Sequence, residues 1–183
     1  MQARLNPVAL FVFPFLLCIF LVACHPRDQK KEPDSIPSKA IRDTLLEVNR
    51  KTVEYETLLI DDFAARYKWR LQQTGTGLRY RITYPGIGSL IRPGQKISMK
   101  YSVRLLTGEM VRYTRPGEIF TFVAGRGEVI TGLEEGILLL KKGSKVNFIV
   151  PSHLAFGVAG DPPDIPPRAS LVFDIEIVDI TNP

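Results

Sequence analysis

Cysteine and histidine are scarce in this chain of 183 residues, which holds two of each. Both cysteines, Cys18 and Cys24, stand in or directly after an apolar N-terminal run, so the rest of the chain has no disulfide and no catalytic thiol. The histidines, His25 and His153, are far apart and form no zinc-binding pattern with cysteine. We therefore expect no metal and no cofactor, and stability must come from an apolar core.

The chain also lacks a strong charge of one sign. It has 24 lysines and arginines against 19 acidic residues, and the resulting net charge of +5 is dispersed without a block of like charges. No aromatic and basic array of the kind that binds RNA is present. We expect no nucleic-acid partner. A hydrophobic content of 45% fits a globular domain.

The first feature that is present is the apolar N-terminal run. Val8–Ala23 carries no charge, and its sixteen residues are fewer than the roughly 20 that a bilayer-spanning helix needs. Residues 1–23 are therefore predicted to be a signal peptide. A short transmembrane anchor is the alternative.

The run ends in LVAC, which resembles a bacterial lipobox, and this resemblance implies that Cys24 carries lipid and attaches the chain to a membrane. We expect a periplasm-facing lipoprotein of the cell envelope, in the outer rather than the inner membrane.

The next 52 residues divide into a polar tether and a helical segment. Residues 24–37 are polar and hold three prolines, as expected of a tether from the lipid. Residues 38–75 form the helical segment, with a helix over 38–67 that has two apolar stripes at helical spacing. One stripe is Ile41, Leu45, Val48, Tyr55 and Leu59, and the other is Leu46, Val53, Ile60, Phe63 and Tyr67. The helix could pack on its own domain, act as a spacer, or form a homodimer, and the residues leave these uses open.

From residue 76 the apolar period changes from helical to two. Ile97, Met99, Tyr101, Val103 and Leu105 alternate with polar residues, which is typical of an antiparallel sheet with one wet face. Further strands are expected near 78–84, 110–113, 119–123, 144–150 and 171–180, and a short helix over 129–140. Residues 76–183 thus predict an α+β domain, a twisted antiparallel sheet of five to six strands wrapped on one short helix and preceded by the long N-terminal helix.

A proline-rich stretch, residues 151–173, connects the last two expected strands. Its sequence PSHLAFGVAGDPPDIPPRASLVF holds a P-x-x-P pattern, which also occurs in docking peptides. A linker, a docking peptide and an ordered loop are the three readings. We expect the ordered loop, because proline limits the entropy that a loop loses on folding.

Three segments together resemble the FKBP-type peptidyl-prolyl cis-trans isomerases. They are GQKISMKYSVRLLTGEMV (94–111), FTFVAGRGEVITGLEEGILLLKKGSK (120–145) and IVPSHLAFGVAGDPPDIPPRASLVFDIEI (149–177). The resemblance covers about residues 76–180 and implies an antiparallel sheet wrapped around a short helix. With the lipobox, the long helix and the PSHLAFG loop, the chain looks most like the gliding-motility-associated FKBP-type lipoproteins.

This resemblance also implies an active-site pocket between sheet and helix. Its residues would be Tyr101, Phe120, Val129, Ile130, Leu133, Phe156, Ile165 and Phe173. Taken singly, each of them could equally be plain core. The expected activity is rotation of X–Pro bonds in proline-containing unfolded or flexible segments of envelope proteins.

Three departures from the family pattern weaken the expected activity. Phe156 stands where the family usually has tyrosine, whose hydroxyl donates to a ligand carbonyl. Val111 and Arg112 align with a Phe-Asp pair that lines the family pocket, and Leu133 replaces a frequent tryptophan. The sequence therefore leaves two functions open: an isomerase of reduced activity, or an FKBP-like chaperone or binding module with little activity.

Overall fold

The computed structural model of the protein describes residues 39–182. The predicted signal peptide (1–23), the lipidation at Cys24 and the tether (24–37) lie outside the described residues. Within them, no helix is long and apolar enough to cross a membrane, and no cluster of three or more His, Cys, Asp or Glu side chains could hold a metal ion.

The described chain folds into two α-helices, one 3-10 helix and a seven-stranded sheet. The helices are α2 (Lys39–Arg66), α3 (Thr131–Ile137) and the 3-10 turn η1 (Ser152–Leu154). The strands are β1 (Gln72–Gln73), β2 (Arg79–Tyr84), β3 (Lys96–Leu105), β4 (Met110–Tyr113), β5 (Phe120–Val123), β6 (Lys145–Val150) and β7 (Leu171–Thr181).

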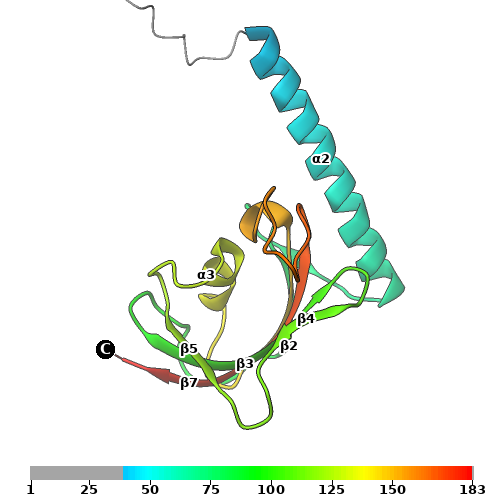
Figure 1. The fold of residues 1–183 in the computed structure, drawn as a ribbon. Helices are drawn as coiled ribbons and strands as arrows, with labels where there is room; N and C mark the ends of the chain where they lie inside the picture. The colour runs from blue at the N-terminus through cyan, green and yellow to red at the C-terminus, as the bar shows by residue number, and fades with distance from the viewer. Residues whose placement is uncertain (1–38, 183) are drawn as a thin grey trace, which may run out of the picture. The chain divides into compact units, whose positions relative to one another are not determined.

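All strand pairs in the sheet are antiparallel, in the order β1-β2-β6-β7-β3-β4, and β5 pairs with the first half of β3. The sheet is strongly curved, and α3 lies on its concave side (Figure 1). This confirms the predicted α+β fold class. The sheet has one strand more than expected, because the two-residue β1 has no apolar pattern that sequence reasoning could detect.

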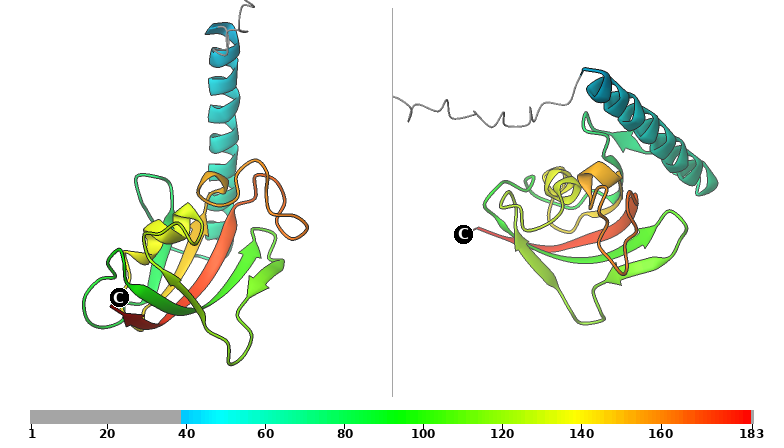
Figure 2. Two further views of the ribbon diagram at one scale, coloured as in Figure 1. Left: turned by 60° about the vertical axis from the view of Figure 1, so that its left-hand side comes forward. Right: turned by 45° about the horizontal axis from the view of Figure 1, so that its top comes forward.

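Two glycines let α3 lie close to the sheet (Figure 2). Gly132 and Gly136 are four residues apart, so they share one face of the helix. A Cβ atom on Gly136 would stand 2.6 Å from the Phe148 ring, and one on Gly132 would stand 2.5 Å from a methyl group of Val150. Any side chain at these positions would push the helix off β6.

Strand β6 is buried on both faces, which explains its unbroken apolar run. Phe148 and Val150 belong to the main core with residues of α3, whereas Ile149 belongs to a second cluster with Ile60 and Phe63 of α2. All three β6 residues have no exposed surface. The part of α2 from Leu46 onward thus covers one face of the sheet where α3 covers the other, and here the expected wet face is absent.

Glu56 on α2 joins the helix to both ends of the proline-rich loop. Its carboxylate accepts hydrogen bonds from the Ser152 backbone N–H (2.6 Å) and hydroxyl (3.1 Å), and from the hydroxyl of Ser170. Ser152 follows β6 and Ser170 precedes β7. Only 9% of Glu56 is exposed.

The loop between β6 and β7 is ordered by its own backbone, as expected. Asp161 and Ile165 exchange two N–H···O=C bonds, and the Arg168 N–H donates to the Gly157 carbonyl. Gly160 has φ +68°, and a Cβ there would stand 2.4 Å from the Ile165 carbonyl oxygen. The loop is therefore folded back on itself and is not a linker.

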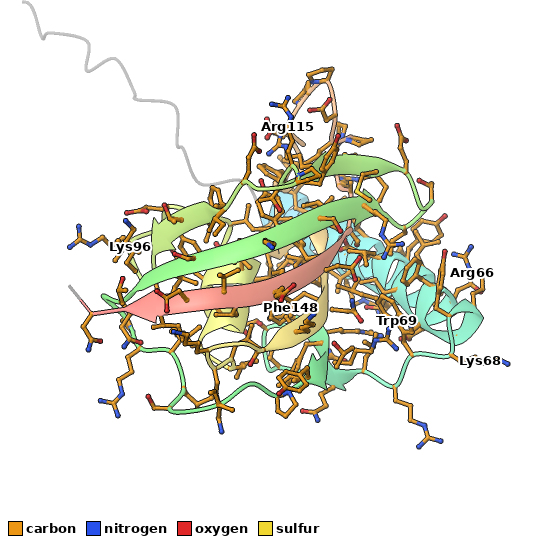
Figure 3. All side chains as sticks on the ribbon, turned by 90° about the horizontal axis from the view of Figure 1, so that it is seen from below. Arg66, Lys68, Trp69, Lys96, Arg115 and Phe148 are labelled. Carbon is orange, nitrogen blue, oxygen red and sulfur yellow. The ribbon has the colours of Figure 1, made fainter. Side chains whose placement is uncertain are left out.

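The outer face of the sheet carries a polar network beside the α2 contact, and Figure 3 looks onto this face. Asp174 accepts hydrogen bonds from Arg104 and Asn147, and Asn147 accepts one from Arg81. The Arg81 guanidinium also lies 3.9 Å from the ring centroid of Trp69. Burial lowers the pKa of Arg81 from its ordinary value, while the negative charge of Asp174 opposes that shift.

Candidate active site

A cavity of about 440 Å³ opens between the concave face of the sheet, the approach to α3 and the proline-rich loop. It is lined by all eight residues that the sequence suggested, Tyr101, Phe120, Val129, Ile130, Leu133, Phe156, Ile165 and Phe173. They come from five parts of the fold, namely β3, β5, the start of α3, the loop between β6 and β7, and β7 itself. Their catalytic role stays a prediction, but their convergence on one cavity is more than plain core packing requires.

The floor of the cavity is built from fully buried side chains. Leu133, Ile165 and Phe173 are exposed by only 3%, 1% and 5%. Leu133 comes from α3, Ile165 from the loop and Phe173 from β7, so floor and core share the same residues. A floor of this kind offers an apolar surface that is already formed before a ligand enters.

The wall is aromatic and half-buried. The rings of Tyr101 and Phe120 meet edge to face, with centroids 5.4 Å apart and an interplanar angle of 78°. This arrangement places the positive edge of one ring on the negative face of the other. Thr114 holds the backbone of Tyr101 by two hydrogen bonds. The Tyr101 N–H donates to the Thr114 hydroxyl (3.1 Å), and the Thr114 N–H donates to the Tyr101 carbonyl (2.9 Å).

Two of the described residues that line the cavity are charged at neutral pH, Arg112 and Glu128, and both lie at its rim. Arg112 comes from β4, forms an ion pair with Asp161, and lies over Phe156 with its guanidinium carbon 5.4 Å from the ring centroid. Glu128 is exposed, and its carboxylate accepts the Val123 N–H at 3.0 Å. One positive charge thus faces the cavity where the family resemblance implied an acid.

Sequence reasoning missed five residues that line the cavity or considered them in another role. Met99, Val103 and Leu171 follow from the period of two, because they share a face with Tyr101 or Phe173. Arg112 was considered only as a departure. Glu128 carried no signal in its spacing. Val111, aligned beside Arg112, packs against the core and does not line the cavity.

Comparison with known proteins agrees with this geometry. A family model described as FKBP-type peptidyl-prolyl cis-trans isomerase matches residues 88–178. Residues 88–178 form an FKBP-type domain. The matched range contains every cavity-lining residue, from Met99 to Phe173. The resemblance that the sequence motifs suggested is confirmed at this level.

Curated relatives match the FKBP-type domain and its near surroundings. The isomerase FkpA of Escherichia coli is 36% identical over 112 residues, which are 60% of this chain and 40% of that protein. A probable FKBP-type isomerase of Haemophilus influenzae is 32% identical over 62% of this chain and 46% of its own. FK506-binding protein 4 of Rhizopus delemar is 40% identical over 51% and 24%. The chain spans less than half the length of these relatives.

A solved structure supports the fold. The crystal structure of a peptidyl-prolyl cis-trans isomerase from Pseudomonas syringae pv. tomato aligns with a TM-score of 0.63, covering 73% of this chain and 96% of that one. Only 22% of the aligned residues are identical, so the likeness concerns the fold of the FKBP-type domain and not its chemistry.

Proposed function

We propose that the protein is a peptidyl-prolyl cis-trans isomerase whose cavity binds X–Pro segments of envelope proteins. The observation that carries the proposal is the convergence of aromatic and aliphatic side chains on one cavity within the FKBP-type domain. The reaction needs no nucleophile and no metal, because it breaks no covalent bond. What it needs is a surface that favours the twisted amide over the planar one.

An apolar cavity provides that preference through differential binding. Rotation about the X–Pro bond is opposed by amide resonance, with a barrier of about 18–20 kcal/mol. The twisted amide has lost this resonance, so its carbonyl is less polar and loses less on leaving water. The rings of Tyr101 and Phe120 form the wall beside the ligand, while Leu133, Ile165 and Phe173 form the floor beneath it. The cavity thus grips the proline ring and excludes water from the reacting bond.

Phe156 is the residue that we propose weakens this activity. It lines the cavity but has no hydroxyl to donate to a substrate carbonyl. A hydrogen bond of this kind contributes about 0.5–1.5 kcal/mol. The variant Phe156→Tyr is therefore expected to raise kcat/KM by about two- to tenfold. An unchanged or lower kcat/KM, in a variant with the wild-type unfolding midpoint, would argue against reduced activity from this cause.

We further propose that the enzyme acts as an envelope lipoprotein, anchored through Cys24 and facing the periplasm. The LVAC sequence after an uncharged run supports this anchor. Together with the long helix and the PSHLAFG loop, it supports a relation to gliding-motility-associated FKBP-type lipoproteins. Exposed apolar side chains along α2, Leu46, Val53, Tyr55 and Leu58, support a homodimer through this helix.

A second candidate function is a binding module that holds unfolded clients. It is favoured by a groove of about 640 Å³ between α2 and the end of the loop, lined by residues such as Val48, Tyr55, Leu59, Leu106 and Pro167. Client holding without catalysis would appear as suppressed aggregation that survives Phe173→Ala, together with negligible isomerase activity.

Proline-limited refolding tests the isomerase proposal. The full chain in mild detergent is added to a small protein whose refolding waits on one X–Pro bond, a step of tens of seconds without catalysis. We expect the slow phase to accelerate in proportion to enzyme concentration. The matched control is Glu176→Ala on the outer face of β7, which should accelerate refolding as well as wild type. No acceleration at micromolar enzyme would refute the proposal.

A further inference from the structure

The cavity rim holds a charged pair whose two members are placed differently with respect to the cavity. Arg112 of β4 lines the cavity, whereas its ion-pair partner Asp161 does not. The pair is partly exposed, with 37% of the Arg112 side chain and 38% of the Asp161 side chain accessible. Asp161 is part of the loop turn that it closes with Ile165. One member of the pair is therefore part of the cavity lining, and the other is not.

The guanidinium of Arg112 also has donors to spare. Its Nη2 group bonds Asp161, while Nε and Nη1 make no hydrogen bond within residues 39–182. The group lies over the face of Phe156, which holds the side chain against the cavity wall and limits the freedom it would lose on binding. Arg112 is thus a held donor at the mouth of a cavity whose other lining residues are apolar, apart from Glu128 and the Tyr101 hydroxyl.

A peptide bound by its proline ring must place polar backbone at this mouth. The carbonyl groups on either side of the X–Pro bond leave water when the ring enters, and each needs a donor to offset that loss. The other side-chain donor among the described lining residues is the Tyr101 hydroxyl, on strand β3, which pairs with β4. Phe156 contributes none.

We propose that Arg112 is a substrate-contacting residue of the isomerase, donating from its guanidinium to a backbone carbonyl beside the X–Pro bond. The inference rests on the proposed function and names a further residue of the same site. The Phe156 ring holds the guanidinium against the wall, whereas Asp161 partly neutralises its charge and does not touch the substrate. Removing the two partners of one ion pair should therefore have different effects.

The charge on Arg112 makes the site sensitive to the residue before proline. With Asp161 present, the ion pair is nearly neutral. Without Asp161, the positive charge of Arg112 is unpaired near the position of the substrate residue that precedes proline. Asp161→Asn should thus favour a substrate with glutamate before proline over one with lysine. Arg112→Met should shift the preference the other way, because it leaves Asp161 and Glu128 as the nearby charges.

The test compares Arg112→Met and Asp161→Asn in the full chain with a chromogenic tetrapeptide assay at low salt. Methionine keeps an unbranched apolar cover over Phe156 and removes every donor. We expect kcat/KM to fall by roughly three- to tenfold in Arg112→Met, the loss of one charge-assisted but partly exposed bond. Asp161→Asn should retain at least the wild-type value with leucine before proline.

Urea unfolding midpoints of both variants separate binding from folding. A pair that merely ties β4 to the loop would give equal losses of activity in both variants, and equal losses would overturn the proposal. Unchanged activity in Arg112→Met would overturn it too. The expected opposite shifts of the glutamate-to-lysine preference would support it even where both midpoints fall. A wild-type chain without activity would instead refute the proposed function and this inference with it.

Discussion

Glu56 offers the sharpest prediction about how the N-terminal helix supports the site. Its carboxylate accepts hydrogen bonds from Ser152 and Ser170, 96 and 114 residues away, and these serines bound the loop that carries Phe156 and Ile165. The variant Glu56→Ala removes all three acceptor contacts and leaves α2 in place through Ile60 and Phe63. The loop would lose its fixed ends.

The cost follows from the buried groups left behind. The Ser152 N–H is buried, and a buried donor without a partner costs about 1–3 kcal/mol. The two hydroxyls can turn toward other acceptors, so they add about 1 kcal/mol between them. We expect Glu56→Ala to lower the free energy of unfolding by about 2–4 kcal/mol, a large part of the 5–15 kcal/mol typical of a domain.

Urea unfolding of the full chain measures this change as a lower midpoint with an unchanged slope. Glu56→Gln should lose less, about 1 kcal/mol, because its amide oxygen still accepts from Ser152. The matched control is Glu54→Ala on the same helix, which removes an exposed ion pair with Arg50 and should change stability by less than about 1 kcal/mol. A Glu56→Ala variant as stable as the Glu54→Ala control would refute the reasoning.

Three further predictions concern the site, the core and the anchor. Phe120→Leu removes the edge-to-face pair with Tyr101, which contributes about 0.5–1.5 kcal/mol. Expressed as a free energy, the loss in kcat/KM should exceed the loss in unfolding stability. Gly136→Ala forces a methyl group into Phe148 and should destabilise by about 1–3 kcal/mol, whereas Gly75→Ala, with no atom near its Cβ, should not; equal midpoints would contradict the close packing of α3. Cys24→Ala should abolish fatty-acid labelling, and continued labelling would exclude Cys24 as the lipid site.

The strands and their inward residues could be predicted where a period of two meets a single buried face. Ile97, Met99, Val103 and Leu105 were expected on one face of β3, and all four are buried. In the strand expected near 78–84, the period of two puts Ile82 and Tyr84 on the same face as the buried Leu78, yet they are 40% and 54% exposed. The pairing of β2 with β6 shifts register between these two residues, so the alternation no longer reports a buried face there.

Hydrogen bonds from a side chain to the backbone of a loop could not be predicted, because no periodic pattern encodes them. Glu134 lies in the first turn of α3, where a negative charge suits the positive end of the helix dipole. In the structure its carboxylate accepts the N–H groups of Gly125 (2.6 Å) and Gly127 (2.8 Å), and so holds the loop before the helix. Likewise, the apolar stripes of residues 38–67 indicated that the helix packs against another surface, but not which surface. Of the ten stripe residues, Ile60 and Phe63 are the buried ones in the described chain, and the homodimer stays a prediction.

The residues that line the cavity could be predicted from family motifs in the sequence. The position of the charged group at its rim could not. The eight suggested residues lie together, but the motifs gave no sign that the Arg112 guanidinium would lie over Phe156. An arginine on an edge strand has many solvent-facing arrangements, and only the position of the loop selects this one. The departure from the family pattern therefore became informative only with the loop in place.

The cis–trans exchange rate of a short proline peptide, measured by NMR with the full chain in mild detergent, tests the central claim most directly. The account predicts faster exchange that rises with protein concentration, and chemical-shift changes confined to residues lining the cavity, such as Tyr101, Ile130 and Phe173. Exchange at the uncatalysed rate, or shift changes on the outer face of the sheet instead of the cavity, would contradict it.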